Sequence, residues 1–287
     1  MLTREQVRLY NENGFLTVED IVPMSLVEDA RQVVEGFVER SRSVADHDEV
    51  FDLEPGHNPE QPRVRRLKEP CALHPIFDRI SRLDALLDIV AALIGPEIRY
   101  QGSKLNMKAA EYGAPVEWHQ DFAFYPHSND DLLAVGVALD DCTPENGCML
   151  MIPGSHRWPI LDHHQDDVFV GAIDVDREGV DTSRAVPVTV GAGGISLHHC
   201  RMLHGSATNT SPAPRRLLLL QLAAVDAWPM LGVSDMAQFD SWVLRGHPTR
   251  QFRVKEMDIR VPLPKHERQG SIYEIQTKFR PKLFAHR

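Results

Sequence analysis

Residues 215–225 read RRLLLLQLAAV, and this stretch contains the longest run of leucines in the chain, Leu217 to Leu220. Such a run fits a buried strand, and it is far shorter than the roughly 20 apolar residues that cross a bilayer. From about residue 98 onward the chain carries more runs of this kind, separated by Gly, Pro, Asn and Asp. They read RYQGSKLNMKAA (99–110), LLAVGVALDD (132–141), GCMLMIPGS (147–155) and AVPVTVGAGGISLHH (185–199). Short strands separated by turn residues predict a β-sandwich or barrel.

The first hundred residues show mainly helical signals. Thr3-x-x-Gln6 and Ser25-x-x-Glu28 both have capping-box spacing. ISRLDALLDIVAALIG (80–95) has the apolar stripe of a helix and is followed by a stop signal, Gly-Pro. Between the two capping boxes, GFLTVEDIV (14–22) reads as a short strand.

No low-complexity linker divides the chain. The polar, Pro-rich segment 45–63 fits a loop or lid of a single domain. We therefore expect a mainly β protein with a helical N-terminal layer. The expected parts of one domain over residues 1–287 are the helical layer at about 1–97, the β core at about 98–225 and a C-terminal extension at 226–287.

Charge and cysteine usage limit the partners and the compartment. The 41 acidic and 31 basic residues give a formal net charge of −10, which opposes binding to nucleic acid or to an anionic membrane. The four cysteines form no CxxC pair, and the polar N-terminus resembles no export signal. These features predict a cytoplasmic protein with reduced cysteines that acts on a small molecule as a monomer or homodimer.

EWHQDFAFYP (117–126) contains a histidine and an aspartate two residues apart, His119 and Asp121, among aromatic residues. In a strand, residues two apart face the same side, so both side chains could converge on a divalent metal ion. The tripeptide recurs at His164-Gln165-Asp166, inside DHHQDD. That second copy lies among charged residues without alternation, as in a loop, so we assign the metal to the first copy.

A metal site needs at least one more ligand. LHHCRMLHGS supplies His198, His199 and His204, and Arg215 follows the last of them by eleven residues. Two histidines and one carboxylate with open positions are typical of non-haem Fe(II) oxygenases. An arginine on the next strand could hold the far carboxylate of a cosubstrate.

Three motifs resemble, in order and spacing, those of the phytanoyl-CoA dioxygenase family of Fe(II)- and 2-oxoglutarate-dependent oxygenases. They are HQD (119–121), TPENGCMLMIPGSHR (143–157) and LHGSATNTSPAPRR (203–216). The resemblance covers roughly residues 8–225. It implies a double-stranded β-helix, or jelly roll. It also implies the cofactor Fe(II), the cosubstrates 2-oxoglutarate and O2, and release of succinate and CO2 as an unactivated C–H bond is hydroxylated.

The family resemblance also assigns site residues. It implies that His119, Asp121 and His204 are the catalytic iron ligands. Arg215 would bind the C5 carboxylate of 2-oxoglutarate with help from Ser206, while Lys104 and Arg66 are further candidates for the cosubstrate pocket. Because halogenating relatives replace the aspartate by a small residue, Asp121 indicates hydroxylation or desaturation rather than halogenation.

The sequence departs from the family at Gly136, where several relatives carry a tryptophan beside the cosubstrate. A glycine there predicts a wider substrate pocket or a pocket that is closed differently. Arg216 should face the opposite side of its strand as a surface charge. Gly191, Gly193 and Gly194 read as a tight turn into the His204 strand, because no phosphate-loop pattern follows them.

The substrate itself is not identified by the sequence. Candidate pocket residues are Gln101, Asn106, Trp118, Phe122, Phe124, Met149, Met151 and Arg201. This mixture of apolar and polar groups suits a small, partly polar metabolite, and an acyl-CoA would need RVRRLK (63–68) for its phosphates. Two other classes of protein stay open at this point: a non-catalytic jelly-roll module that binds a metal or a sugar, and a Zn-dependent hydrolase.

Overall fold

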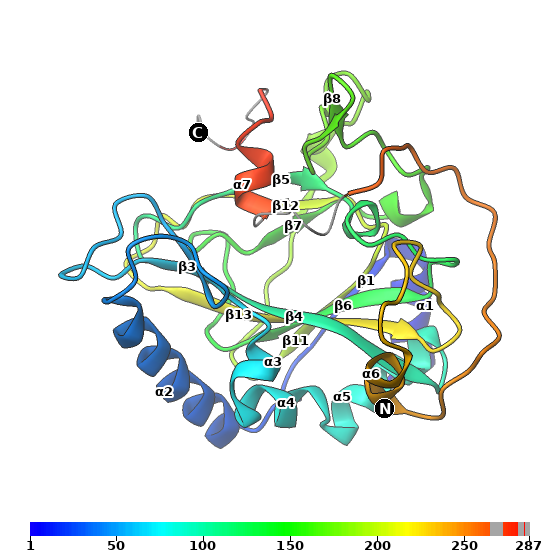
Figure 1. Cartoon of the computed structure of the whole chain (residues 1–287), viewed down its shortest axis with the longest axis horizontal. Coiled ribbons are helices and arrows are strands. Elements are labelled where there is room, and N and C mark those ends of the chain that lie inside the picture. Colours follow the sequence, from blue (N-terminus) through cyan, green and yellow to red (C-terminus); the bar gives the residue numbers. More distant parts are fainter. Residues whose placement is uncertain (265–271, 281–283, 285–287) are drawn as a thin grey trace.

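The computed structural model describes residues 1–264, 272–280 and 284. Two antiparallel sheets face each other and helices cover the outer side of the larger one, which confirms the expected jelly roll with a helical layer (Figure 1). The larger sheet has eight strands in the order β1-β11-β6-β13-β4-β3-β2, with β14 also paired to β4. The smaller sheet has the order β10-β7-β12-β5.

The predicted strands form the centre of the larger sheet. Its strands are β1 (Phe15–Val18), β2 (Phe51–Leu53), β3 (Val64–Lys68), β4 (Ile98–Lys108), β6 (Leu132–Ala138), β11 (Ile195–His199), β13 (Arg215–Ala224) and β14 (Val243–Arg245). RRLLLLQLAAV is β13, which lies between β4 and β6 and is hydrogen-bonded to both. Its leucines are buried on both faces, because one face meets the helices and the other meets the smaller sheet.

The smaller sheet supplies most of the proposed metal site. It consists of β5 (Val116–His119), β7 (Met149–Met151), β10 (Val186–Pro187) and β12 (His204–Ser206). These strands are short, and the sequence pattern predicted only part of them. A separate two-stranded hairpin is formed by β8 (His164–Gln165) and β9 (Val168–Phe169).

The helices are α1 (Arg4–Asn13), α2 (Met24–Ser41), α3 (Pro70–Leu73), α4 (Pro75–Ser81), α5 (Asp84–Ile94), α6 (Met236–Ser241) and α7 (Ile272–Gln276). Thr3 and Gln6 form the predicted capping box of α1. The capping box at Ser25 is wrong, because α2 begins one residue earlier after Pro23 and has no side-chain cap. The helix predicted over 80–95 is in fact two, since the chain leaves α4 at Arg82 and starts α5 at Asp84.

The N-terminal part contributes more than helices. Strands β2 and β3 come from the segment expected to be a loop and from the basic run after it, and they extend the larger sheet beyond β4. The glycine turn at 191–194 also differs from the expectation, because it leads into β11 and not directly into the His204 strand. Among the described residues, no helix is both long and apolar enough to cross a lipid bilayer.

The second His-Gln-Asp copy lies apart from both main sheets, in the β8–β9 hairpin rather than in a plain loop. His164 contacts Asp162 and the backbone oxygen of Pro262. Asp166 is exposed and has a positive φ of 50°. No metal cluster among the described residues includes this tripeptide.

Candidate active site

Three buried side chains converge at one end of the smaller sheet: His119, Asp121 and His204. Each offers one ligand atom, and these atoms lie within 4.8 Å of one another. His119 and His204 are paired across β5 and β12, with ring centroids 4.1 Å apart. β5 ends at His119, and a 3-10 turn at Asp121–Ala123 brings the Asp121 carboxylate to 3.8 Å from His119 Nε2. The turn, not strand alternation, therefore makes the pair converge.

Both histidines are held in the orientation that a metal requires. Nδ1 of His119 donates to the backbone oxygen of Glu117 at 2.8 Å, and Nδ1 of His204 donates to that of Met202 at 2.9 Å. Because a carbonyl oxygen only accepts, the proton resides on Nδ1 and the Nε2 lone pair is available to a metal ion.

The charges of the triad also suit a divalent cation. Burial lowers the pKa of His119 to about 4, although the Asp121 carboxylate opposes this, and burial also holds the pKa of His204 well below its usual value. Burial alone would raise the pKa of Asp121, but Lys104 and the neighbouring histidines outweigh burial and hold it well below its usual range. Neutral imidazoles and an ionised carboxylate are the forms that bind metal.

His198 is a further neighbour of the triad. Its Nε2 lies 3.2 Å from Oδ2 of Asp121, and its ring centroid is 4.6 Å from that of His204. His198 can donate to one carboxylate oxygen while the other, Oδ1, faces His119. It therefore orients Asp121, as groups that hydrogen-bond to a metal ligand commonly do. His199 lies on the other face of β11 and contacts Arg201 and Cys200 instead.

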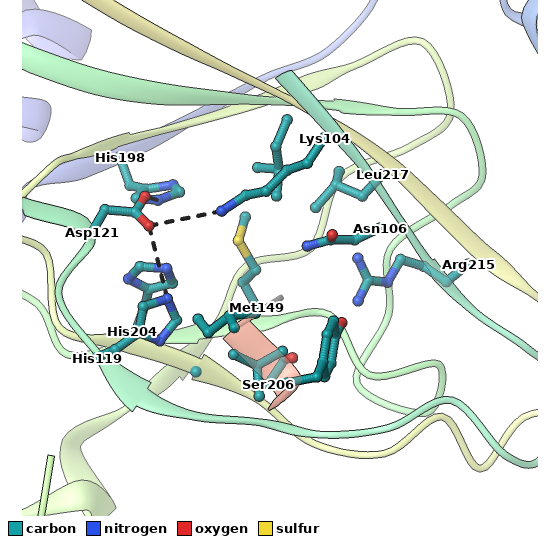
Figure 2. Close-up of a pocket in the computed structure, with 15 residues that line it drawn as sticks. Lys104, Asn106, His119, Asp121, Met149, His198, His204, Ser206, Arg215 and Leu217 are labelled. Carbon is teal, nitrogen blue, oxygen red and sulfur yellow. Dashed lines mark hydrogen bonds and ion pairs between the residues drawn. The ribbon is translucent and has the colours of Figure 1, made fainter. Parts of the chain in front are cut away.

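Arg215 lies at the far end of the same pocket from the triad, with Lys104, Asn106, Leu217 and Met149 between them (Figure 2). Its side chain is buried and donates from Nη2 to the backbone oxygen of Gly147 at 3.1 Å. Its Nε has no hydrogen-bond partner, and no carboxylate among the described residues pairs with it. A buried guanidinium without a counter-ion suits a bound carboxylate.

Ser206 and Asn106 also line this pocket, and Oδ1 of Asn106 is buried without a partner. The donor set therefore fits Fe(II) at the triad and a dicarboxylate that reaches to Arg215. The free space between these side chains is about 40 Å³. Ile272 and Tyr273 of α7 complete the lining.

A second cavity of about 480 Å³ adjoins the first, and Lys104 and Asp121 line both. Lys104 Nζ lies 4.0 Å from Oδ1 of Asp121. Arg66 and Lys68 line only the second cavity and share one fully buried carboxylate, Asp52, at 2.6 Å and 3.0 Å. Arg66 is thus outside the cosubstrate pocket where the family comparison had assigned it.

The predicted substrate residues separate into several environments. Phe124 lines the second cavity and packs against His119 in a T-shaped arrangement, with ring centroids 5.7 Å apart. Asn106 and Met149 line the cosubstrate pocket, and Gln101 lines a third, larger cavity. The others line none of these cavities: Trp118 packs against Phe284, Phe122 and Met151 belong to hydrophobic clusters, and Arg201 forms an ion pair.

Arg201 is a structural residue rather than a substrate contact. Its Nη1 donates to Oδ2 of Asp130 at 3.0 Å, and Lys255 donates to the same carboxylate at 2.7 Å. We expect Asp130→Asn to lower the free energy of unfolding by about 2 to 4 kcal/mol, because it leaves the Arg201 side chain, which is only 13% exposed, without a counter-charge. Urea denaturation measures this change.

Asp131→Asn is the matched control for this change. Asp131 pairs with Arg253, and both side chains are more than a third exposed. The free energy of unfolding should therefore fall by no more than about 1 kcal/mol. Equal losses in the two variants would contradict the structural role of the Asp130 cluster.

Of the two expectations for Gly136, the structure favours the pocket that is closed differently over the wider one. A Cβ atom at this position would lie 2.6 Å from Ser196 Oγ and 3.2 Å from Leu217 Cδ1. Leu217 therefore fills the space beside the cosubstrate pocket. We expect Gly136→Trp to yield little folded protein. Gly136→Ala should lower the free energy of unfolding by about 1 to 3 kcal/mol, because the added methyl group overpacks this site. Thermal unfolding of Gly136→Ala with and without Ser196→Ala tests this, since the second change removes the nearest atom and should restore part of the loss.

Arg216 also differs from the expectation. It faces away from Arg215, as predicted, but its side chain is only 13% exposed and pairs with Asp140 at 2.8 Å and Glu35 at 2.6 Å. It therefore ties β13 to α2 instead of forming an isolated surface charge.

Comparisons with known proteins place the chain in a family. Residues 10–217 match the sequence profile of the family Phytanoyl-CoA dioxygenase (PhyH). A probable alpha-ketoglutarate-dependent hypophosphite dioxygenase from Stutzerimonas stutzeri is 34% identical over 98% of this chain and 99% of its own length. Ectoine dioxygenase from Sphingopyxis alaskensis is 26% identical, over 78% of this chain and 76% of that protein. The crystal structure of EctD from S. alaskensis with 2-oxoglutarate and 5-hydroxyectoine superposes with a TM-score of 0.66 at 25% identity, and covers 88% of this chain and 87% of that one.

The fold and the His-Asp-His cluster define a non-haem iron oxygenase of the jelly-roll class. The chain belongs to the phytanoyl-CoA dioxygenase family. It is an iron- and 2-oxoglutarate-dependent dioxygenase that uses Fe(II), 2-oxoglutarate and O2. This result replaces the two alternatives of a non-catalytic module and a Zn-dependent hydrolase.

Sequence reasoning missed several residues of the cavities. Tyr125 and Gln221 line the second cavity, and α7 contributes Ile272 and Tyr273 to the cosubstrate pocket and Ile275 to the second cavity. Tyr125 was visible as one more aromatic residue after the HQD motif. The residues of α7 carried no signal, because they lie about 150 residues from the motif and beyond the resemblance to the family.

Proposed function

We propose that the protein hydroxylates an unactivated C–H bond of a small metabolite and releases succinate and CO2. The observation that carries this proposal is the buried His-Asp-His face opposite an arginine without a counter-ion, with a separate cavity beside the face. Iron and 2-oxoglutarate, when bound, activate dioxygen for attack on a C–H bond. We assign the whole chain, residues 1–287, to a single catalytic domain.

The roles of the side chains follow from their positions. His119, Asp121 and His204 hold the iron, with His198 fixing the rotamer of Asp121. Arg215 and Ser206 bind the far carboxylate of 2-oxoglutarate, and Lys104, which borders both cavities, neutralises negative charge near the iron. The substrate occupies the second cavity, where Phe124 and Tyr125 shield the reacting carbon from water.

A second candidate reaction is oxidation of a P–H bond, as in the relative named for hypophosphite. The basic side chains of the second cavity, Arg66, Lys68 and Lys104, favour an oxyanion of this kind. The volume of the second cavity, about 480 Å³, favours a substrate larger than hypophosphite, because cavities of roughly 300 to 1,000 Å³ hold drug-sized ligands.

Succinate release that depends on an added compound tests both candidates. The purified protein is supplied with Fe(II), 2-oxoglutarate and air, and a panel of small metabolites is compared with hypophosphite. A metabolite that gives stoichiometric succinate and a hydroxylated product supports the first reaction, whereas conversion of hypophosphite to phosphite supports the second. Succinate formation that no compound stimulates would contradict both.

A further inference from the structure

The inner faces of β4 and β13 form a continuous floor under three cavities. In β13, Arg215, Leu217 and Leu219 line the cosubstrate pocket, and Gln221, the next residue on the same face, lines the second and third cavities. The register pairs Leu219 with Lys104 and Gln221 with Gly102. A molecule that lies along this floor beyond Lys104 therefore extends from the second cavity toward the third.

We call the third cavity the Gln101 chamber. It has a volume of about 750 Å³ and is lined by Gln101, Tyr125, Pro126, His127, Gln221, Pro229, Leu231, Gly232, Val233, Ser234, Asp235, Gln238, Phe239 and Trp242. Tyr125 and Gln221 are shared with the second cavity. The Tyr125 hydroxyl interacts with both Asp121 and Gln221, so the wall common to the two cavities also touches the proposed iron site.

Two buried polar atoms of the chamber lack a hydrogen-bond partner among the described residues. One is Nε2 of Gln101, which can only donate. The other is Nε2 of His127. Nδ1 of His127 donates to the backbone oxygen of Tyr125 at 2.8 Å, and burial lowers the pKa of His127 to about 4, so its free Nε2 is an acceptor at neutral pH. Buried polar groups are normally satisfied, so an unpaired donor and acceptor lining one cavity indicate a ligand.

The chamber and the second cavity differ in charge. Among the described residues, no lysine or arginine lines the chamber and Asp235 is its one carboxylate, which accepts from the backbone of α6 at Ala237 and Gln238. Phe239, Trp242 and Leu231 add apolar walls. The second cavity, in contrast, presents Arg66, Lys68 and Lys104.

The carboxylates near these cations have several other contacts. Arg66 and Lys68 share the single carboxylate of Asp52, and the partner of Lys104 is the proposed iron ligand Asp121. Glu49 is exposed at the rim. Glu69 accepts from Tyr100 and the Ser103 backbone, and burial raises its pKa although Arg66 and Lys104 act to lower it.

We infer that the substrate is an elongated organic anion, with its anionic end among Arg66, Lys68 and Lys104 and its other end in the Gln101 chamber. That far end is uncharged and both donates and accepts hydrogen bonds, as a hydroxyl or an amide does. This inference rests on the proposed function, because it takes the second cavity as the site of reaction. A simple ion such as hypophosphite would leave the chamber unused.

Matched pairs of probes test the inference. Each pair shares its anionic head, and one member carries a hydroxylated tail: methylphosphonate against 3-hydroxypropylphosphonate, and acetate against 5-hydroxypentanoate. The readout is the visible charge-transfer band of the anaerobic complex of the protein with Fe(II) and 2-oxoglutarate, which changes when a molecule binds beside the iron. We expect the tailed member of at least one pair to shift the band at a concentration lower by about tenfold or more, as one or two added hydrogen bonds predict.

Three variants connect this advantage to the chamber. Gln101→Leu and His127→Phe each remove one unpaired group, and Ser234→Trp fills the chamber from an exposed position of its wall. All three variants should remove most of the advantage of the tail, and the concentrations at which the shorter probes shift the band should stay unchanged. Gln251→Leu, an exposed glutamine outside the chamber, is the control and should retain the advantage.

The outcomes separate the inference from the function on which it rests. Absence of the band before any probe is added would contradict the iron and 2-oxoglutarate site itself. A normal band with equal response to both members of each pair, or with no response to any probe, would overturn the inference alone. An advantage of the tail that survives in all three variants would also overturn it.

Discussion

Asp121→Gly is expected to abolish substrate-dependent succinate release and to weaken Fe(II) binding by more than about 100-fold. The change removes the one anionic ligand of the proposed triad, and loss of an outer partner alone costs roughly 10- to 100-fold in metal affinity. Asp121 is buried beside Lys104 and three histidines, so no water-exposed group can substitute for it. Iron titration under anaerobic conditions and a succinate assay measure the two effects.

Asp166→Gly is the matched control, since Asp166 ends the second His-Gln-Asp tripeptide. Its side chain is 79% exposed, and its φ of 50° lies in the region that glycine prefers. Stability and iron binding should therefore change by no more than about 0.5 kcal/mol. Equal damage in the two variants, or greater damage at Asp166, would show that the iron binds elsewhere.

Arg215→Gln is expected to raise the 2-oxoglutarate concentration needed for half-maximal activity by roughly 30-fold to several thousandfold, with Fe(II) binding nearly unchanged. Truncating one partner of a buried charge pair costs about 2 to 5 kcal/mol, and each 1.4 kcal/mol corresponds to a factor of about ten. Arg215 has no carboxylate partner among the described residues, so the effect should fall on the cosubstrate and not on an internal ion pair.

Arg216→Gln provides the contrast for this prediction, because Arg216 is the next residue but faces α2 and pairs with Asp140 and Glu35. It should lower thermal stability and leave the requirement for 2-oxoglutarate unchanged. If Arg215→Gln behaves like Arg216→Gln while Lys104→Met raises the requirement, then Lys104 carries the carboxylate instead. Titration of the charge-transfer band with 2-oxoglutarate separates these cases.

The strands at the centre of the larger sheet could be predicted from local pattern. β4, β6 and β13 are long enough to show continuous burial or alternation, and the turns between them carry Gly, Pro, Asn or Asp. The short strands β2, β3, β5 and β12 could not be predicted in the same way. Three to five residues carry too little periodicity, and these strands form because neighbouring strands supply their hydrogen bonds.

The proposed iron ligands and Arg215 were predictable because their spacing along the chain is itself a family pattern. Their orientation was not predictable. Backbone oxygens of Glu117 and Met202 fix the two imidazoles, and His198 approaches Asp121 from a different sheet. His198 gave no stronger signal in the sequence than His199, although the strand turns only one of them toward the iron site.

By itself, the sequence determined the jelly-roll class, the helical layer and the family, because each depends on local propensities or on a fixed order of motifs. Only the tertiary structure decided which side chains surround the substrate. The packing of β11 and β13 against β6 leaves no room for a side chain at Gly136, and docking of α7 completes the cosubstrate pocket. Cavity walls join residues that are far apart in the chain, and their contacts depend on strand register and close packing, which no local pattern encodes.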